Sequence, residues 1–127
     1  MRFKSLVPGG VNRASDVVTY AAGKAVNVAR AIQTIGGRVA CLGVQGGMMG
    51  PDLLALLDRD GLSHRFVETV APTRLCTTVI DDAKQEATEL IEDAPAMTIQ
   101  EGETLLGELQ SMLKGVGVVV FSGSLAR

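Results

Sequence analysis

The chain has 127 residues, and its 12 Lys and Arg against 14 Asp and Glu give a formal net charge of −2. It has no basic run and only 3% aromatic residues, so it lacks the clustered cations and stacking side chains that nucleic-acid binding needs. Its 46% hydrophobic residues predict one folded domain rather than a disordered chain, and its 15 glycines indicate loops that need backbone freedom.

Neither the N-terminal residues nor the cysteines suggest secretion. Residues 1–10 contain no apolar run before a small-residue cleavage site, and no stretch approaches the ~18 apolar residues of a membrane span. Cys41 and Cys76 each lie in an apolar, strand-like run, which predicts two small core residues rather than a disulfide or a metal pair. We therefore expect a cytoplasmic protein with no membrane partner.

The first half of the chain alternates predicted strands and helices. The β-branched and aromatic run Asp16–Tyr20 predicts a strand, and apolar residues at helical spacing predict a helix over Lys24–Ile35 that a Gly-Gly pair ends. Arg38–Gly43 is a short apolar run typical of a buried parallel strand. A glycine-rich loop and a proline then predict a helix over Asp52–Asp60.

The second half continues the same alternation. Two extended stretches, Arg65–Val70 and Leu75–Ile80, are followed by an acidic hairpin turn at Asp81–Lys84. Thr98–Glu101 has the pattern of a capping box, and a helical stripe of leucine and methionine follows it. Val116–Phe121 then predicts a buried strand. This order of elements predicts an α/β fold, without an internal repeat or boundary.

One segment combines groups that suit an anionic or polyol ligand. Gly23, Lys24 and Asn27 lie where a predicted strand runs into a helix, whose N-terminal N–H groups and dipole attract anions. Lys24 adds a positive charge, and the amide of Asn27 suits sugar hydroxyls. The segment is neither a Walker A loop nor a GxGxxG motif. From these residues alone, a ligand site and a turn with a solvated lysine both remain open.

The same segment begins a series of family motifs. Gly-Lys-x-x-Asn-Val-Ala-Arg-Ala, followed by Gly-Gly and Cys-Leu-Gly-x-x-Gly-Gly, resembles the N-terminal sugar-binding signature of PfkB-type (ribokinase-like) carbohydrate kinases. Pro8–Arg13 resembles the family's lid, Thr73–Leu90 the central strands of its sugar-phosphate branch, and Phe121–Leu125 its Ser-Gly-Ser-Leu-Pro loop. The resemblance implies a central, mostly parallel sheet with flanking helices and a small β lid, with lid strands at about 3–20 and the α/β core at about 21–127.

The resemblance also implies an activity and a set of site residues. The activity would be ATP- and Mg²⁺-dependent phosphorylation of fructose 1-phosphate, fructose 6-phosphate or tagatose 6-phosphate, and Thr-Glu-Leu-Ile-Glu at 88–92 slightly favours the last. The lids of two subunits would pack together in a homodimer. The implied substrate contacts are the sugar ligands Gly23, Lys24 and Asn27, the phosphate ligands Arg74 and Ser124, and Arg13, which would reach a site across the dimer.

Several departures from the family pattern limit this expectation. Ala22 and Ala25 replace two glycines of the usual Gly-Gly-Lys-Gly, and Ala126 replaces a proline. The family's Asn-x-x-Glu and Gly-x-Gly-Asp motifs do not occur, so we expect the catalytic Asp beyond Arg127, and no catalytic residue or metal site within the chain. ATP and Mg²⁺ would bind mostly through residues outside it. We therefore expect a piece of a larger protein, which supplies the acceptor side of the site.

Other interpretations remain open at this point. The strand–Gly–helix start suggests a nucleotide-binding oxidoreductase domain, although the GxGxxG fingerprint is absent. The missing catalytic motifs suggest a non-catalytic binding or dimerisation module of the same fold. The carboxylates at 81, 82, 89 and 92 could bind Mg²⁺ but are expected to be turn formers, and His64 is not expected to form a catalytic triad or a metal site.

Overall fold

The computed structural model describes residues 1–123, which form two compact units. The small unit consists of Met1–Thr19 and Arg74–Asp93, and the core unit consists of Tyr20–Thr73 and the chain from Ala94 onward. The residue pattern alone predicted no internal boundary, because composition does not change where the chain passes between the units, whereas the family resemblance implied lid strands at about 3–20 and a core at about 21–127. None of the helices within residues 1–123 is long and apolar enough to cross a membrane.

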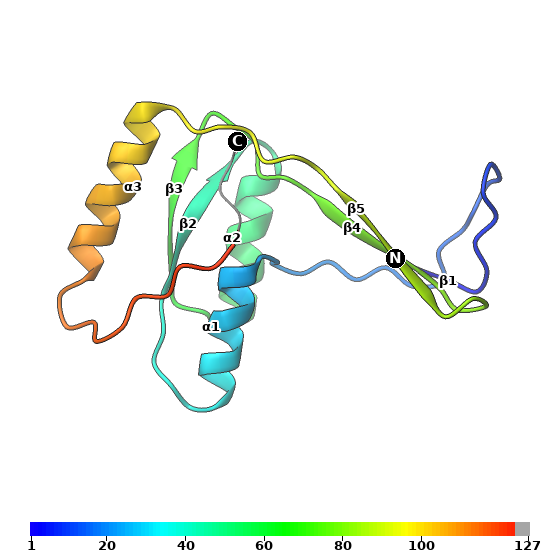
Figure 1. The fold of residues 1–127 in the computed structure, drawn as a ribbon, viewed down its shortest axis with the longest axis horizontal. Coiled ribbons are helices and arrows are strands. Elements are labelled where there is room, and N and C mark those ends of the chain that lie inside the picture. Colours follow the sequence, from blue (N-terminus) through cyan, green and yellow to red (C-terminus); the bar gives the residue numbers. More distant parts are fainter. Residues whose placement is uncertain (124–127) are drawn as a thin grey trace. The chain divides into compact units, whose positions relative to one another are not determined.

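The small unit is built on a β-hairpin. β4 (Cys76–Asp81) pairs antiparallel with β5 (Glu86–Ile91), and β1 (Arg2–Phe3) pairs parallel with the other edge of β4 (Figure 1). The predicted acidic turn is confirmed: a carboxylate oxygen of Asp81 accepts the N–H groups of Ala83 and Lys84. This bonding stabilises the turn from within, as is usual for Asp at such positions.

The strand predicted over Asp16–Tyr20 is wrong except at its first residue. Asp16 forms a single antiparallel bridge with Arg2, and residues 17–20 have no strand partner. Asn12 closes the intervening loop by bonding both the N–H and the C=O of Val7. β-branched residues favour strands mainly by packing against neighbouring strands, and the described residues offer Val17 and Val18 none.

The core unit is an α/β arrangement around two parallel strands. β2 and β3 pair from Cys41 opposite His64 to Gly46 opposite Thr69. Figure 1 shows α1 and α2 on one side of this pair and α3 on the other. The bounds are α1 Lys24–Thr34, β2 Cys41–Gly46, α2 Met49–Arg59, β3 His64–Thr69 and α3 Ile99–Met112.

The two faces of the β2–β3 pair follow from the alternation of side chains along a strand. His64 bonds Asp58 of α2, whereas its neighbour Arg65 bonds Glu108 of α3, so successive residues of β3 contact helices on opposite faces. The buried core lies on the α1–α2 side. Its members come from both helices, from β2 and from the segments that precede α1 and β3: Ala21, Val26, Ala29, Cys41, Leu57 and Leu62.

The predicted helices are confirmed with small shifts. α1 ends one residue before its predicted end, and Gly36 adopts the left-handed conformation (φ 81°) expected after it. α2 begins at Met49 rather than Asp52, with Pro51 inside the first turn, where the missing N–H costs nothing. α3 has the predicted capping box, in which Thr98 and Glu101 each accept the other's backbone N–H.

Two predictions about buried residues are wrong. Val116–Phe121 forms no strand, and its side chains are exposed, Phe121 at 83%. A buried parallel strand needs partners on its edges and helices on its faces, and the described residues place neither around this segment. Cys41 is in the core as predicted, but Cys76 is exposed at the start of β4. Burial raises the pKa of the Cys41 thiol above its ordinary 9.0.

Candidate functional site

The N-terminus of α1 is open toward solvent. Gly23 precedes it with φ 127° and ψ 147°, a conformation that strongly favours glycine, and no heavy atom lies closer than 4.0 Å to where its Cβ would be. No side chain caps the helix, and its first turn contains no acidic residue. The first turn of α3, in contrast, has the capping box and Glu101. Of these two helix starts, that of α1 therefore keeps its N–H groups available to a ligand.

Lys24 and Asn27 are exposed on the first turn of α1, as predicted. Within residues 1–123 the Lys24 ammonium forms no ion pair, and the Asn27 N–H donates to Gly23 O at 2.9 Å in the first helical bond. α1 runs opposite to β2, so its N-terminus is directed toward the edge at which the strands end (Figure 1). Ligands of open α/β sheets bind at that edge. The structure thus brings Gly23, Lys24 and Asn27 together.

Arg30 extends this cluster, and the sequence analysis did not identify it as a site residue. Its Nη1 donates to Oδ1 of Asn27 at 3.1 Å, and its Nη2 donates to Ala21 O at 2.6 Å. Nε and Nη2 also donate to Oδ2 of Asp60, at 3.1 and 2.5 Å, in a half-buried ion pair. The Tyr20 ring lies 5.9 Å from the guanidinium carbon. These contacts link the start of α1 to the end of α2.

The ion pair with Arg30 lowers the pKa of Asp60. Hydrogen bonding from Arg30 is the largest cause that holds the pKa of Asp60 below its ordinary 3.8. One signal in the sequence could have identified Arg30: it lies three residues after Asn27, so both share a helix face. Its bond to Asp60 joins residues 30 positions apart, and local patterns do not reveal such a contact.

Gly46, the last residue of β2, and Gly50 in α2 lie where neighbouring groups approach closely. A Cβ on Gly46 would overlap the carbonyl oxygens of Thr69 and Ala71, and one on Gly50 would overlap the Gln45 side chain. Thr73 bonds Gly46 in both directions: its Oγ1 accepts the Gly46 N–H at 3.0 Å, and its own N–H donates to Gly46 O at 2.8 Å. This part of the family-like signature is explained by packing, with no ligand required.

The other predicted site residues lie outside the α1 cluster. Arg74 is exposed just before β4 in the small unit, where its Nη1 donates to Glu92 O at 3.4 Å. Arg13 is also exposed in the small unit, in a loop rather than in the expected lid strand. Ser124 lies outside the described residues. The roles of Arg74 and Ser124 toward a phosphate, and of Arg13 toward a site across a dimer, stay predictions.

Of the carboxylates considered for Mg²⁺, Asp81 and Glu92 accept backbone N–H groups and Asp82 pairs with Arg2. No group of three or more His, Cys, Asp or Glu side chains within residues 1–123 could hold a metal ion. The second oxygen of Asp81 accepts the Leu6 N–H at 3.2 Å, and Glu92 accepts the Leu75 N–H at 2.7 Å. Nε2 of His64 lies 3.0 Å from Asp58. The described residues therefore provide no cluster of such side chains that fits Mg²⁺.

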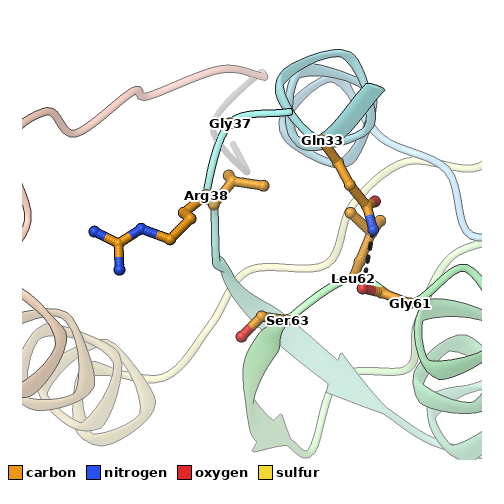
Figure 2. Close-up of a pocket in the computed structure, with 7 residues that line it drawn as sticks. Gln33, Gly37, Arg38, Gly61, Leu62 and Ser63 are labelled. Carbon is orange, nitrogen blue, oxygen red and sulfur yellow. Dashed lines mark hydrogen bonds between the residues drawn. The ribbon is translucent and has the colours of Figure 1, made fainter. Parts of the chain in front are cut away.

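A surface cavity of about 360 Å³ lies at the opposite end of the strands (Figure 2). The loops that lead into β2 and β3 line it, and Gln33 closes one side by donating to Gly61 O at 3.1 Å. Figure 2 shows the Arg38 side chain extending away from Gln33, so the polar groups do not converge on one point. The cavity contains none of the predicted site residues, and we do not regard it as the functional site.

The elements form an α/β arrangement of the ribokinase-like type. The family model described as pfkB family carbohydrate kinase matches residues 1–127, and the chain belongs to this family. Family membership argues against the oxidoreductase interpretation.

Several similar solved structures are described as phosphofructokinases. One is phosphofructokinase-2 from Escherichia coli in complex with fructose-6-phosphate, with 28% identity and a TM-score of 0.89 over 98% of this chain and 41% of that one. The tetrameric inhibited form of the same enzyme has a TM-score of 0.87, over 98% and 41% of the two chains, at the same identity. A possible 1-phosphofructokinase from Thermotoga maritima has 25% identity and a TM-score of 0.77, over 98% and 42% of the two chains.

The coverage is unequal between the chains. Nearly all of this chain is matched, but it spans only about 41% of the length of the Escherichia coli enzyme. The match includes the α1 segment and both units, whereas the Gly-x-Gly-Asp motif of the family does not occur in these 127 residues. What the whole protein phosphorylates is therefore a matter for proposal.

Proposed function

We propose that this chain forms the acceptor-binding side of an ATP- and Mg²⁺-dependent kinase that phosphorylates a hydroxyl of a sugar phosphate. The observation that carries this proposal is the uncapped start of α1, where Gly23, Lys24 and Asn27 present hydrogen-bond donors and positive charge together. Similarity to an enzyme whose structure contains fructose-6-phosphate supports the substrate class. Fructose 6-phosphate, fructose 1-phosphate and tagatose 6-phosphate are the proposed acceptors.

In this proposal the α1 residues orient the acceptor. Gly23 lets a sugar oxygen approach the backbone, and the Lys24 ammonium and the Asn27 amide bond its hydroxyls. Arg74 and Ser124 are proposed to contact the phosphate of the acceptor, since a guanidinium can bind a phosphate through two parallel bonds. Arg13 is proposed to reach a site in the partner subunit of a homodimer. Holding an acceptor hydroxyl in line with the donor phosphate is a large part of phosphoryl-transfer catalysis.

A coupled assay on the complete protein that contains this chain tests the proposal. ADP release with ATP and Mg²⁺ is measured for each of the three sugar phosphates, with the unphosphorylated sugars as controls. We expect release that depends on a sugar phosphate, and a rise in KM of about tenfold or more for Lys24→Met, the loss of one charged hydrogen bond. ADP release that stays at the protein-free blank with every sugar phosphate would instead favour a non-catalytic binding or dimerisation module.

A further inference from the structure

Arg30 is held in place from several directions at once. Nε and Nη2 bond Asp60 near the end of α2, Nη2 also bonds Ala21 O, and Tyr20 lies near the guanidinium carbon. Asp60 is itself fixed at the C-cap of α2. A guanidinium with this many partners keeps one orientation, because its donors form a rigid planar fork. The remaining nitrogen, Nη1, is thereby directed at Asn27.

This contact decides which way the Asn27 amide faces. A guanidinium has only donors, so the amide atom that meets Nη1 at 3.1 Å must be the oxygen, Oδ1. The amide NH₂ group is then turned away from Arg30, on a side chain that is exposed. Asn27 therefore offers donors to a ligand, like the neighbouring Lys24 ammonium and the N–H groups of the first turn of α1.

We propose that Arg30, fixed by Asp60, is a positioning residue that orients Asn27 as a hydrogen-bond donor toward oxygen lone pairs of the acceptor sugar. The inference rests on the proposed function, in which Asn27 binds the acceptor. As a consequence, Asn27, Lys24 and the N–H groups of the first turn of α1 all present hydrogen-bond donors to the ligand. These donors favour a sugar that presents hydroxyl or phosphate oxygens to them. They disfavour a ligand that presents a hydrogen-bond donor, such as an ammonium group, at the same place.

A purely structural role is the competing explanation, because the Arg30–Asp60 pair also joins α1 to α2. The two roles separate in Arg30→Lys, which keeps the charge but has a single nitrogen that cannot serve Asp60, Ala21 and Asn27 together. Arg65→Lys is the matched control. Arg65 also joins two elements, by bonding Glu108 and Ser111 of α3 from β3, and makes none of the described contacts with Asn27.

The orientation itself is tested by NMR in the complete protein without any ligand. The order parameter of the Asn27 side-chain amide is measured, with the resonance assigned by its loss in Asn27→Ala. We expect a value near the ~0.85 of a rigid group in the wild type and in Arg65→Lys, and below ~0.6 in Arg30→Lys. An amide that is equally rigid in Arg30→Lys would overturn the proposal.

The effect on the acceptor is tested by a double-mutant cycle of KM and kcat. We expect Arg30→Lys to raise KM about tenfold with Asn27 present, and by less than about twofold in the Asn27→Ala background, since Arg30 acts through Asn27. An equal rise in both backgrounds, or in Arg65→Lys, would show a structural role and overturn the proposal. If the wild type uses no sugar phosphate, the proposed function fails, and the NMR result still decides whether Arg30 orients Asn27.

Discussion

At the scale of single residues, several carboxylates in this chain accept backbone N–H groups or pair with arginine. Glu101 shows this well, since one of its oxygens accepts the Thr98 N–H at 2.7 Å and the other accepts the Val70 N–H at 2.6 Å. The bonds from Thr98 and Val70 hold the pKa of Glu101 below its ordinary 4.5. The Glu101 carboxylate thus joins the start of α3 to the segment after β3. Its lowered pKa has this structural cause and does not indicate a catalytic carboxylate.

The capping box can be tested from its hydroxyl partner. Thr98→Ala removes the acceptor of the Glu101 N–H, and we expect a loss of about 1 kcal/mol in the free energy of unfolding. Thr98→Ser keeps the hydroxyl and should lose much less. Urea denaturation followed by circular dichroism measures both, and equal losses in the two variants would contradict the assignment of the cap.

The Arg30–Asp60 pair predicts a specific dependence of stability on pH. Because the pKa of Asp60 is lowered in the folded state, its contribution is fully present above the ordinary 3.8 and is lost as pH falls through the lowered value. The stability difference between wild type and Asp60→Asn should therefore shrink from pH 6 to pH 3. Asp93→Asn, which changes an exposed carboxylate outside the described ion pairs, is the control. A difference that stays constant with pH would contradict the ion pair.

At the scale of elements, the sequence predicted helices better than strands. α1 was predicted within one residue and the capping box of α3 at its residues, because helices depend on local spacing and local bonds. Val116–Phe121 and Asp16–Tyr20 were predicted as strands and form none, apart from the bridge at Asp16. A strand is stabilised by partners distant in sequence, so the apolar pattern alone cannot tell whether they are present.

Two glycine-to-alanine substitutions separate the effect of steric overlap on stability from the effect of helix propensity. Gly46→Ala places a Cβ against two carbonyl oxygens at the end of β2, and we expect a loss of about 1–3 kcal/mol in stability. Gly107→Ala, in the middle of α3 with open space around the new Cβ, should gain about 1 kcal/mol. Thermal unfolding of both variants measures this, and a destabilised Gly107→Ala would contradict the description of α3.

At the scale of the whole molecule, the small unit carries the proposed subunit contact. Val17 and Val18 are 58% and 64% exposed, and Tyr20 at the edge of the core unit is 56% exposed. We expect the complete protein to be a dimer by light scattering and Val18→Asp to weaken the association, because a buried unpaired carboxylate is costly. Val70→Asp, at a valine of the core unit that is 89% exposed, is the control. A wild-type protein that stays monomeric at high concentration would contradict this subunit contact.

The 127 residues alone should have no kinase activity. They contain the proposed acceptor ligands, but no Gly-x-Gly-Asp motif and no carboxylate cluster for a metal within residues 1–123. General-base assistance contributes roughly 10²–10⁴ in rate and positioning contributes more, so turnover should equal the background. Release of ADP above the blank, dependent on a sugar phosphate, would place catalytic residues within this chain.

The central claim, that the start of α1 binds the acceptor, is tested most directly by calorimetric titration of the complete protein with fructose 6-phosphate, fructose 1-phosphate and tagatose 6-phosphate. We expect one of them to bind with measurable heat, and Asn27→Ala or Lys24→Met to weaken binding about tenfold, as for the loss of one hydrogen bond to the ligand. The exposed core-unit variant Arg38→Met should bind like the wild type. Unchanged affinity in both α1 variants, or no heat with any of the three sugar phosphates, would contradict the account.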